Sequence, residues 1–424
     1  MKTRAVRLYG KNDLRLEEFE LPAMQPDEIL ARIVTDSICM STYKTAIQGE
    51  DHKRVPKDIA TNPVMMGHEF CGEIVEVGER WKSEFAPGEC FVMQTALNYK
   101  GSMAAPGFSF PYVGGDATYI IIPSVVMEIG HLIKYEARHF YQGSLVEPMG
   151  CIIGAYHASY HTQPGQYTHD MGIREGGSLA LLGACGPMGL GAIDYALHAD
   201  KRPSVLVVTD IDDGRLARAE SIFSVEEARQ AGISLTYINT AKQDDPVRAL
   251  CVQTEHGFDD VMVFAPVSAV IEQADALLAR DGCLNFFAGP TNTALSANLN
   301  FYNVHYGGTH VTGTSGGNTD DMREAVRLMG AGRIDPSAMI THVGGLDSVI
   351  DTTLNLPHIS GGKKLVYVQL SMPMTPLDEL HRLGGTDRRY LELADIVRRH
   401  NGLWSGEAED CLLAIHSRPT DSDT

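Results

Sequence analysis

The sequence lacks paired cysteines. Its eight cysteines form no Cys-x-x-Cys pair and no compact framework. This spacing excludes a small disulfide-stapled scaffold and is typical of reduced thiols in a cytoplasmic protein. The cysteines stand at positions 39, 71, 90, 151, 185, 251, 283 and 411.

Basic residues are also scarce. The chain has 35 Lys and Arg against 54 Asp and Glu, which gives a formal net charge of -19. Nucleic-acid binding depends on clustered Lys and Arg that neutralise phosphates, so we expect no nucleic-acid partner. A phosphorylated small molecule would still require a local group of cations.

The sequence has no uninterrupted hydrophobic run of membrane-spanning length. Residues 176–193 are uncharged, which is near the lower limit for crossing a bilayer, but Pro187 and six glycines interrupt them. The first residues, MKTRAVRL, contain no apolar core of signal-peptide length. We therefore expect a cytoplasmic protein with no membrane partner.

Length and composition indicate a globular enzyme of two or three domains. The 424 residues are 44% hydrophobic and 21% charged. Short apolar runs separated by Pro/Gly turns predict a β-rich first part, and alternating strands and helices after Ser178 predict a parallel sheet. The expected fold is α/β, with a β-rich catalytic domain (1–158), a doubly wound dinucleotide-binding domain (159–303), a return to the first domain (304–370) and a helical C-terminal extension (371–424).

A glycine-punctuated segment around His68 carries a metal-site signature. The pattern Gly-His-Glu-x-x-Gly-x5-Gly runs from Gly67 to Gly78 and follows a Cys-x-Ser pair about thirty residues upstream. Thiolate, imidazole and carboxylate are the usual side-chain ligands of catalytic zinc. A lone His-Glu pair is more often a surface or capping feature, but the full pattern is far more restrictive. The candidate donors are Cys39, His68, Glu69 and Glu147.

A second glycine-rich loop follows the expected strand 178–182. Residues 183–189 are Gly-Ala-Cys-Gly-Pro-Met-Gly, close to the dinucleotide fingerprint Gly-x-Gly-x-x-Gly. Gly186 and Gly189 match its second and third glycines, whereas Ala184 replaces the first. Because the loop lies between a strand and a helix, we expect it to bind a dinucleotide. The residues expected to do so are Gly183, Gly186, Pro187, Met188 and Gly189.

An acidic residue ends the next expected strand, 204–209. Asp210 follows about twenty residues after the last glycine of the loop, where a carboxylate can accept hydrogen bonds from the ribose hydroxyls of NAD. The same carboxylate would repel the 2′-phosphate of NADP, so NAD(H) is favoured over NADP(H). Two alternatives remain: Asp210 could cap the next helix, and Arg215 or Arg218 could receive a phosphate.

These features together resemble the zinc-dependent medium-chain dehydrogenase/reductase family, over about residues 1–370. The resemblance implies a GroES-like N-terminal domain and a Rossmann cofactor domain. Within the family, the chain is most similar to the polyol branch. The stretches that carry this similarity are 11–16 (KNDLRL), 49–53 (GEDHK), 67–72 (GHEFCG), 285–290 (NFFAGP) and 313–323 (GTSGGNTDDMR).

The resemblance implies one catalytic zinc. Cys39 and His68 would be ligands, Glu69 a ligand or an adjacent catalytic carboxylate, and Glu147 would take the position that other members fill with a second cysteine. Cys151 is a competing candidate, although a lone thiol in an apolar stretch is more often a small core residue.

The resemblance also bears on proton transfer and on a second metal. Ser41 matches the catalytic hydroxyl that exchanges a proton with the substrate oxygen; otherwise a serine here would be a strand-end residue bonded to backbone. Many relatives have a histidine as the outer proton relay five residues after the ligand cysteine, where this chain has Lys44. Residues 90–115 contain Cys90 alone instead of four closely spaced cysteines, so we expect no structural zinc.

The activity implied by the resemblance is the NAD(P)H-linked reduction of a ketose phosphate, here L-sorbose 1-phosphate to D-glucitol 6-phosphate. Zinc would act as a Lewis acid on the ketone oxygen while the nicotinamide supplies the hydride. We also expect a homo-oligomer, either a dimer or a tetramer. Gly313 and Thr314 are expected to line the nicotinamide pocket. The candidate cations for the substrate phosphate are His52, Lys53, Arg54, Lys363 and Lys364, although each run is by default a solvated surface patch.

Two other functions remain open. The first is a zinc polyol or alcohol dehydrogenase that acts on an unphosphorylated sugar alcohol. The second is a zinc-free quinone-reductase relative, or a nucleotide-binding protein that has lost catalysis. The joint presence of Cys39, Ser41, His68 and Glu147 argues against the second.

Overall fold

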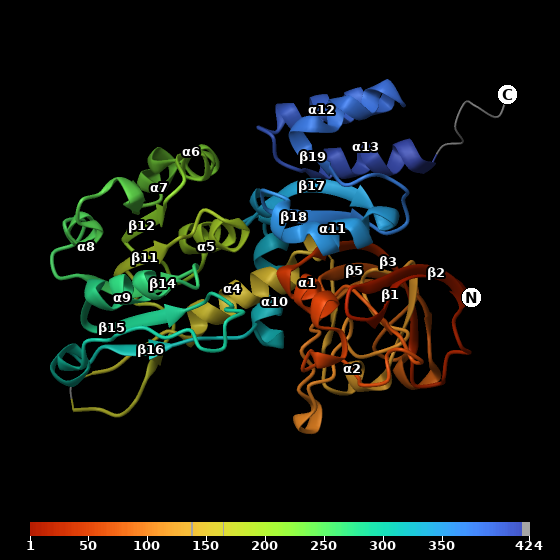
Figure 1. The fold of residues 1–424 in the computed structure, drawn as a ribbon, viewed down its shortest axis with the longest axis horizontal. Coiled ribbons are helices and arrows are strands. Elements are labelled where there is room, and N and C mark those ends of the chain that lie inside the picture. The colour runs from red at the N-terminus through yellow and green to blue at the C-terminus, as the bar shows by residue number, and fades with distance from the viewer. Residues whose placement is uncertain (137–138, 164, 418–424) are drawn as a thin grey trace. The chain divides into compact units, whose positions relative to one another are not determined.

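The computed structural model describes residues 1–136, 139–163 and 165–417, which fall into two compact units (Figure 1). Unit 1 comprises Met1–Glu147 and Ile340–Thr424, and unit 2 comprises Pro148–Met339. Unit 1 is rich in strands, whereas unit 2 alternates strands and helices. The expected α/β fold class is confirmed.

Strand β3 lies inside the main sheet of unit 1. The strand order is β19-β17-β18-β3-β5-β6-β8, with β7 also paired to β3, and a smaller sheet has the order β2-β1-β4. Nearly every residue of β3 is buried, because neighbouring strands and packed side chains cover it. The strands are β1 (Lys2–Gly10), β2 (Asp13–Glu20), β3 (Ile29–Ile38), β4 (Val64–Met65), β5 (Phe70–Val77), β6 (Cys90–Met93), β7 (Tyr119–Ile122), β8 (Leu132–Lys134), β17 (Ile340–Gly345), β18 (Lys363–Tyr367) and β19 (Thr375–Pro376).

Helices in unit 1 connect these strands, and those of the C-terminal extension pack against β18 of the main sheet. Leu380, Leu393 and Trp404 from the C-terminal residues share one buried cluster with Leu365 and Tyr367 of β18. The described part of the C-terminal extension is therefore packed into unit 1, and residues 418–424 lie outside the described residues. The helices are α1 (Met40–Gln48), α2 (Ser124–Glu128), α3 (Phe140–Gly143), α11 (Val349–Asn355), a 3-10 helix (Leu377–Gly385), α12 (Arg389–Arg399) and α13 (Gly406–Ser417). Helix α4 (Val146–Ala158) begins in unit 1 and continues into unit 2.

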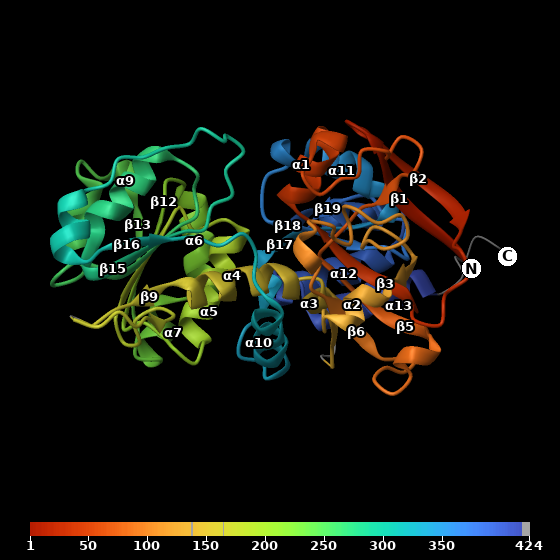
Figure 2. The same ribbon diagram turned by 90° about the horizontal axis from the view of Figure 1, so that it is seen from below.

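Unit 2 contains a six-stranded parallel sheet in the order β13-β12-β11-β14-β15-β16. Figure 2 shows α9 on one face of this sheet and α5 and α7 on the other, the doubly wound arrangement expected from the sequence. Its elements are β9 (Tyr160–His161), β10 (Asp170–Met171), β11 (Ser178–Leu182), α5 (Pro187–His198), β12 (Val205–Asp210), α6 (Asp213–Ile222), α7 (Val225–Gln230), β13 (Ser234–Asn239), α8 (Pro246–Cys251), β14 (Phe258–Val263), α9 (Ser268–Leu277), β15 (Leu278–Phe286), β16 (His310–Thr312) and α10 (Thr319–Gly330).

The boundaries between the units differ from those expected. The first boundary falls after Glu147, within the first turn of α4, and not after residue 158. The second falls after Met339, because β16 pairs in parallel with β15 and so extends the sheet of unit 2. Residues 304–339 therefore belong to unit 2, and the return to unit 1 begins at Ile340.

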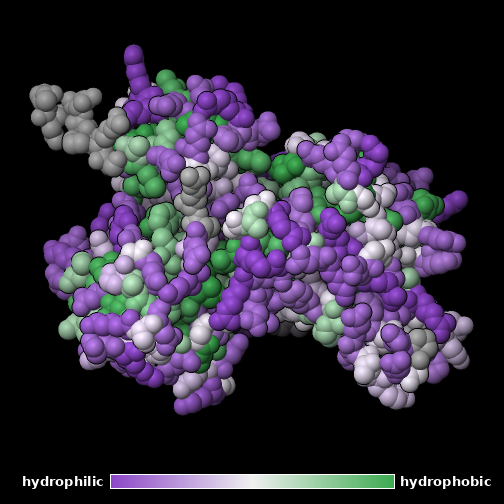
Figure 3. All heavy atoms as spheres, turned by 180° about the vertical axis from the view of Figure 1, so that it is seen from behind, coloured by the Kyte–Doolittle hydropathy of each residue, from purple (hydrophilic) through white to green (hydrophobic). Residues whose placement is uncertain are grey.

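Hydrophilic side chains cover most of the face shown in Figure 3, with smaller hydrophobic areas between them. This surface agrees with the acidic composition of the chain. Within the described ranges, no helix combines the length and the apolar character that a membrane crossing requires.

A largely irregular segment, residues 94–118, packs its backbone against the loop that precedes His68. Gly107 has φ +78°, and a Cβ atom there would lie 2.0 Å from the carbonyl oxygen of Gly67. Gly67 has φ +86°, and its Cβ would lie 2.4 Å from the backbone nitrogen of Asp116. Both positions therefore require glycine, and the contact fixes the loop from behind.

We predict that Gly107→Ala destabilises the protein more than Gly101→Ala. Both glycines have φ +78°, but a Cβ at Gly101 would meet nothing within 4 Å. The control variant thus measures the left-handed backbone cost alone, about 1 kcal/mol, and Gly107→Ala adds the clash with Gly67. Urea unfolding of both variants measures the difference. Equal losses of unfolding free energy would contradict the proposed contact.

Candidate functional site

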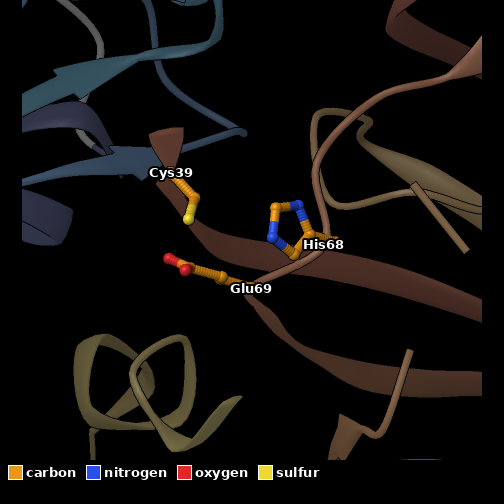
Figure 4. Close-up of side chains that lie close together, drawn as sticks. All are labelled: Cys39, His68 and Glu69. Carbon is orange, nitrogen blue, oxygen red and sulfur yellow. The ribbon is translucent and has the colours of Figure 1, made fainter. Parts of the chain in front are cut away.

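Three of the four candidate metal donors lie together in unit 1. Cys39 follows β3 directly, while His68 and Glu69 directly precede β5. One donor atom from each residue lies within 4.8 Å of the other two, and no other such group occurs among the described residues (Figure 4). Tetrahedral zinc, with bonds of roughly 2.0–2.3 Å, spaces its ligands roughly 3.5 Å apart. Small side-chain shifts reach that spacing, so the donor set fits zinc.

Glu69 is buried and held by two side chains. Nζ of Lys363 lies 2.5 and 2.6 Å from its carboxylate oxygens, and the hydroxyl of Ser37 donates to Oε2. Burial tends to raise the pKa of Glu69, but the ammonium of Lys363 holds that pKa below its usual range. Glu69 therefore carries a negative charge beside the donor cluster.

His68 is buried, and burial lowers its pKa to about 4. The ring is therefore neutral near pH 7, as a metal ligand requires. Thr42 Oγ1 lies 3.4 Å from Nδ1, and Ser41 Oγ lies 3.4 Å from Nε2. Ser41 Oγ also lies 3.1 Å from Cys39 Sγ. Ser41 occupies the first turn of α1, not the end of a strand, and its hydroxyl reaches both donor residues.

Glu147 lies outside the group of three donors. It is half-buried in the first turn of α4, and its charge is among those that raise the pKa of Lys363. Burial lowers the pKa of Arg54, and the charge of Glu147 opposes that shift. The competing candidate, Cys151, is half-buried further along α4 and belongs to unit 2. Among the four expected ligands, the structure thus groups Cys39, His68 and Glu69, with Glu147 in electrostatic range of the same lysine.

Phe108 connects two of the candidate phosphate-binding residues to His68. Its ring is tilted against the ring of His68 at a centroid distance of 4.6 Å and stacks with His52 at 5.9 Å. The guanidinium carbon of Arg54 lies 5.6 Å from the same ring centroid. Besides burial, the charge of Arg54 lowers the pKa of His68. Arg54 and His52 therefore lie beside the donor cluster.

The other three cation candidates are placed differently. Lys53 is exposed, whereas Lys363 and Lys364 are buried and are not the surface patch that their sequence suggests. Burial opposes the charge of Lys363, but Cys39, Glu69 and Glu147 raise its pKa. Nζ of Lys364 donates to the carbonyl oxygens of Ser360 and Gly362 at 2.9 and 2.8 Å, and burial lowers its pKa to about 8.

The glycine-rich loop of unit 2 has the geometry of a pyrophosphate-binding turn. Gly183 has φ +67°, so it supplies the left-handed turn although Ala184 replaces the first glycine of the fingerprint. A Cβ at Gly186 would meet nothing within 4 Å, whereas one at Gly189 would lie 1.9 Å from the carbonyl oxygen of Ala184. Helix α5 begins at Pro187, with Met188 in its first turn. Open space therefore faces a helix N-terminus, where a phosphate group can approach the backbone.

Asp210 ends β12 and connects that strand to the loop. Oδ2 accepts a hydrogen bond from the Cys185 N–H at 3.1 Å, and Oδ1 accepts from the N–H groups of Ile211 and Asp212 at 2.8 and 3.2 Å. Asp212, not Asp210, caps α6 by accepting from the Arg215 N–H at 2.9 Å. The capping alternative for Asp210 is therefore excluded.

The remaining cofactor candidates lie after β16. Gly313 approaches the backbone of β15, since a Cβ there would lie 3.0 Å from the carbonyl oxygen of Phe286. The buried hydroxyl of Thr314 has no hydrogen-bond partner among the described residues. An unsatisfied buried hydroxyl is consistent with a position where a cofactor supplies the missing partner.

Sequence reasoning did not identify the partner of Glu69 or the contacts of Phe108. Lys363 is 294 residues from Glu69, and no local pattern connects them. Thr42 was also missed as the neighbour of His68 Nδ1, because a threonine beside Ser41 carries no metal-site signal of its own.

Two family models match the chain. The alcohol dehydrogenase GroES-like domain matches residues 25–131, and the zinc-binding dehydrogenase model matches residues 187–331. The first match falls in unit 1 and the second in unit 2.

Curated relatives match nearly the whole chain. L-sorbose 1-phosphate reductase of Klebsiella pneumoniae is 52% identical over 412 residues, 97% of each chain. Mannitol-1-phosphate 5-dehydrogenase of Aliivibrio fischeri is 49% identical over 416 residues, 98% of each chain. Among solved structures, 2R,3R-butanediol dehydrogenase from Bacillus subtilis has a TM-score of 0.70 at 23% identity, covering 86% of this chain and 99% of the other. That structural likeness supports the fold.

Fold and matches together define a zinc-dependent dehydrogenase that uses a nicotinamide cofactor. The chain belongs to the zinc-dependent medium-chain dehydrogenase/reductase family. It is an oxidoreductase of the alcohol/polyol dehydrogenase class, and the expected family is confirmed.

We predict that alanine substitutions at two glycines of the nucleotide loop have different effects: one lowers cofactor affinity and the other lowers stability. Gly186→Ala places a methyl group in open space where the pyrophosphate approaches, so NADH affinity falls about tenfold while the melting temperature is retained. Gly189→Ala clashes with the Ala184 carbonyl and lowers the melting temperature. NADH fluorescence titration and thermal melts measure the two effects. Unchanged affinity in Gly186→Ala would contradict the assigned pyrophosphate position.

Proposed function

We propose that this chain is a zinc-dependent, NAD(P)H-linked reductase of ketose phosphates, with L-sorbose 1-phosphate to D-glucitol 6-phosphate as the first reaction to test. The observation that carries the proposal is the position of Arg54, a half-buried cation whose guanidinium carbon lies 5.6 Å from the centroid of the Phe108 ring, which packs against His68. The names of the two curated relatives, which both contain a sugar or polyol phosphate, support a phosphorylated substrate.

In this proposal Cys39 and His68 hold one catalytic zinc, and Glu69 or Glu147 provides the carboxylate. When bound, zinc would polarise the substrate ketone oxygen, and the reduced nicotinamide would supply the hydride to the carbonyl carbon. Lys363 balances the charge of Glu69, so the buried site does not hold unopposed anions.

Ser41 is proposed to deliver the proton to the substrate oxygen as the alcohol forms. Its hydroxyl is close to both Cys39 Sγ and His68 Nε2, where a substrate oxygen at the metal would lie within reach. Lys44 stands where many relatives have the relay histidine, and its charge lowers the pKa of His52. We propose that His52, which burial keeps neutral, is the next group after Ser41 in the path of the proton.

The substrate phosphate is proposed to bind at Arg54 and His52. The alternation of exposure along this segment places His52 and Arg54 inward and Lys53 outward. The Arg54 N–H donates to His52 Nδ1 at 3.3 Å, and Ser109 Oγ donates to the Arg54 carbonyl at 2.6 Å. These contacts fix the backbone of Arg54, and its guanidinium donates from Nη1 to the Met103 carbonyl at 3.4 Å. A guanidinium can bind a phosphate group in a bidentate manner.

We propose NAD(H) as the preferred cofactor, because the Asp210 carboxylate lies at the end of β12, where the ribose binds. Of the two arginines that could receive a 2′-phosphate, Arg218 is engaged elsewhere, since its Nη1 donates to the carbonyl oxygen of Ala338 at 3.1 Å. Steady-state rates with NADH and NADPH test the preference, and a higher kcat/KM with NADPH would reverse it.

The proposed function predicts a strong preference for the phosphorylated substrate. We expect kcat/KM for D-glucitol 6-phosphate oxidation to exceed that for D-glucitol by roughly 100-fold, because a charged phosphate contact contributes about 2–3 kcal/mol. Activity should be lost to a zinc chelator and restored by zinc. Equal activity on the free polyol would favour the unphosphorylated alternative, and chelator-resistant activity without bound zinc would contradict the metal mechanism.

Arg54→Met should lower kcat/KM for the phosphorylated substrate by roughly 30-fold, because it removes one charged contact to the phosphate. The loss should be much smaller with the free sugar, so the ratio of the two substrates reports the contact itself. Lys57→Met is the matched control, because Lys57 is exposed and donates to the Glu50 carbonyl. If both variants lose activity equally on both substrates, the phosphate does not bind at Arg54.

A second candidate reaction is the oxidation of mannitol 1-phosphate, favoured by the 49% identity to the enzyme of that name. It uses the same metal and cofactor residues, but the reacting C5 lies four carbons from the phosphate-bearing C1, whereas the ketone carbon C2 of L-sorbose 1-phosphate is adjacent to C1. Comparing kcat/KM for mannitol 1-phosphate with that for D-glucitol 6-phosphate decides between the two.

We also propose that the chain forms a homo-oligomer. A group of exposed apolar side chains lies next to the edge strand β16 of unit 2, and such a group is unusual on a monomer. Sedimentation velocity should show a species at two or four times the chain mass of 46.2 kDa. A single 46.2 kDa species at all concentrations would contradict it. The exposed residues are Phe301, Tyr302, Val304, Tyr306 and Val311.

A further inference from the structure

Glu409 on α13 is a buried carboxylate at the inner side of the C-terminal extension. Oε1 accepts a hydrogen bond from the Phe140 N–H at 2.8 Å, and Oε2 accepts from the Tyr141 N–H at 2.9 Å. The Tyr367 hydroxyl also donates to Oε2, at 2.7 Å, and in turn accepts from Trp404 Nε1 at 2.9 Å. One side chain of the extension thus binds α3 and β18 simultaneously.

The first of these partners, α3, leads directly to Glu147. Ser144 N–H donates to the Phe140 carbonyl and Leu145 N–H to the Gln142 carbonyl, so a tight turn connects α3 to α4. Both Ser144 and Leu145 are fully buried. The position of Glu147 therefore depends on how α3 is held.

The same helix packs against the strands that border the donor cluster. Thr35 Oγ1 on β3 donates to the Phe140 carbonyl at 2.7 Å. A Cβ at Gly143 would lie 2.3 Å from Cys71 Sγ on β5, so the helix and this strand are in direct contact. β3 runs into Cys39 and β5 follows Glu69, and α3 therefore supports both segments from behind.

The second partner, β18, carries Lys363. Tyr367 and Lys363 are four residues apart on this strand, so their side chains lie on the same face. Tyr367 pairs with Thr35 and Lys364 pairs with Ile38 in the register with β3. The bond from Tyr367 to Glu409 thus fixes one end of the strand whose other end supplies the ammonium to Glu69.

We propose that Glu409 is a positioning residue for the metal centre, and that the C-terminal extension serves to hold Glu147 and Lys363 in place. The inference rests on the proposed function, because it concerns the same metal-binding site. Removing a carboxylate from water costs several kcal/mol, and an apolar residue could pack the extension onto unit 1 without that cost. The directional bonds to two N–H groups and one hydroxyl are what the carboxylate adds.

The experiment compares Glu409→Gln with Glu407→Gln in the full chain. Glutamine presents an amide NH₂ toward groups that are themselves donors, so the bonds to Phe140 and Tyr141 cannot both form. Glu407 is the matched control on the same helix, because it is exposed and binds Arg399 and His400 at 2.6 and 3.0 Å. The readouts are the rate of zinc release to a chelator and the thiolate-to-cobalt absorption band of the cobalt-substituted protein.

We expect Glu409→Gln to release zinc about tenfold faster than the wild type and to shift the cobalt band, as other mutations behind metal ligands do. Glu407→Gln should match the wild type in both readouts. An unchanged release rate and an unchanged band in folded Glu409→Gln would overturn the proposal. A wild-type chain that binds neither zinc nor cobalt would instead overturn the metal centre itself.

A milder variant keeps the test decisive if Glu409→Gln does not fold. Tyr367→Phe removes a single hydroxyl from the network and leaves the packing of the ring intact. The bond to Glu409 and the bond from Trp404 Nε1 are both lost, and zinc should still be released faster than from the wild type, by about threefold. Wild-type release from Tyr367→Phe would then count against the proposal.

Discussion

The candidate metal site depends on the buried ion pair between Lys363 and Glu69. Both side chains are almost fully shielded from solvent, with relative exposures of 5% and 1%. Removing one partner of such a pair leaves a buried charge uncompensated, at a cost of about 3–5 kcal/mol. The pair also connects β18 to the loop before β5. The part of the chain that returns to unit 1 therefore supplies the cation beside the donor cluster of Cys39, His68 and Glu69.

Features encoded by local patterns could be predicted from the sequence. The expected strand 178–182 coincides with β11, because its apolar run is bounded by glycines on both sides. The nucleotide loop was predicted for the same reason, since Gly186 and Gly189 stand at fixed offsets from a strand. The helix α1 was not expected, because the residues after Cys39 show little apolar periodicity.

Features that depend on distant contacts could not be predicted. Nothing near Lys363 indicates Glu69, and nothing near Phe108 indicates His68, because each contact forms only when sheets and loops have assembled. The membership of residues 304–339 in unit 2 depends on such a contact as well. The three residues of β16 belong to unit 2 through their pairing with β15, and nothing near β16 indicates that partner.

The discontinuity of unit 1 sets an order of events during synthesis. Glu69 leaves the ribosome 294 residues before Lys363, a delay of roughly 15 to 60 s at typical rates of translation. Unit 2 is continuous in sequence and emerges completely within that interval. The parallel sheet can therefore fold while the N-terminal strands still lack β18, and the metal-binding loop reaches its final charge balance only when the last part of the chain arrives.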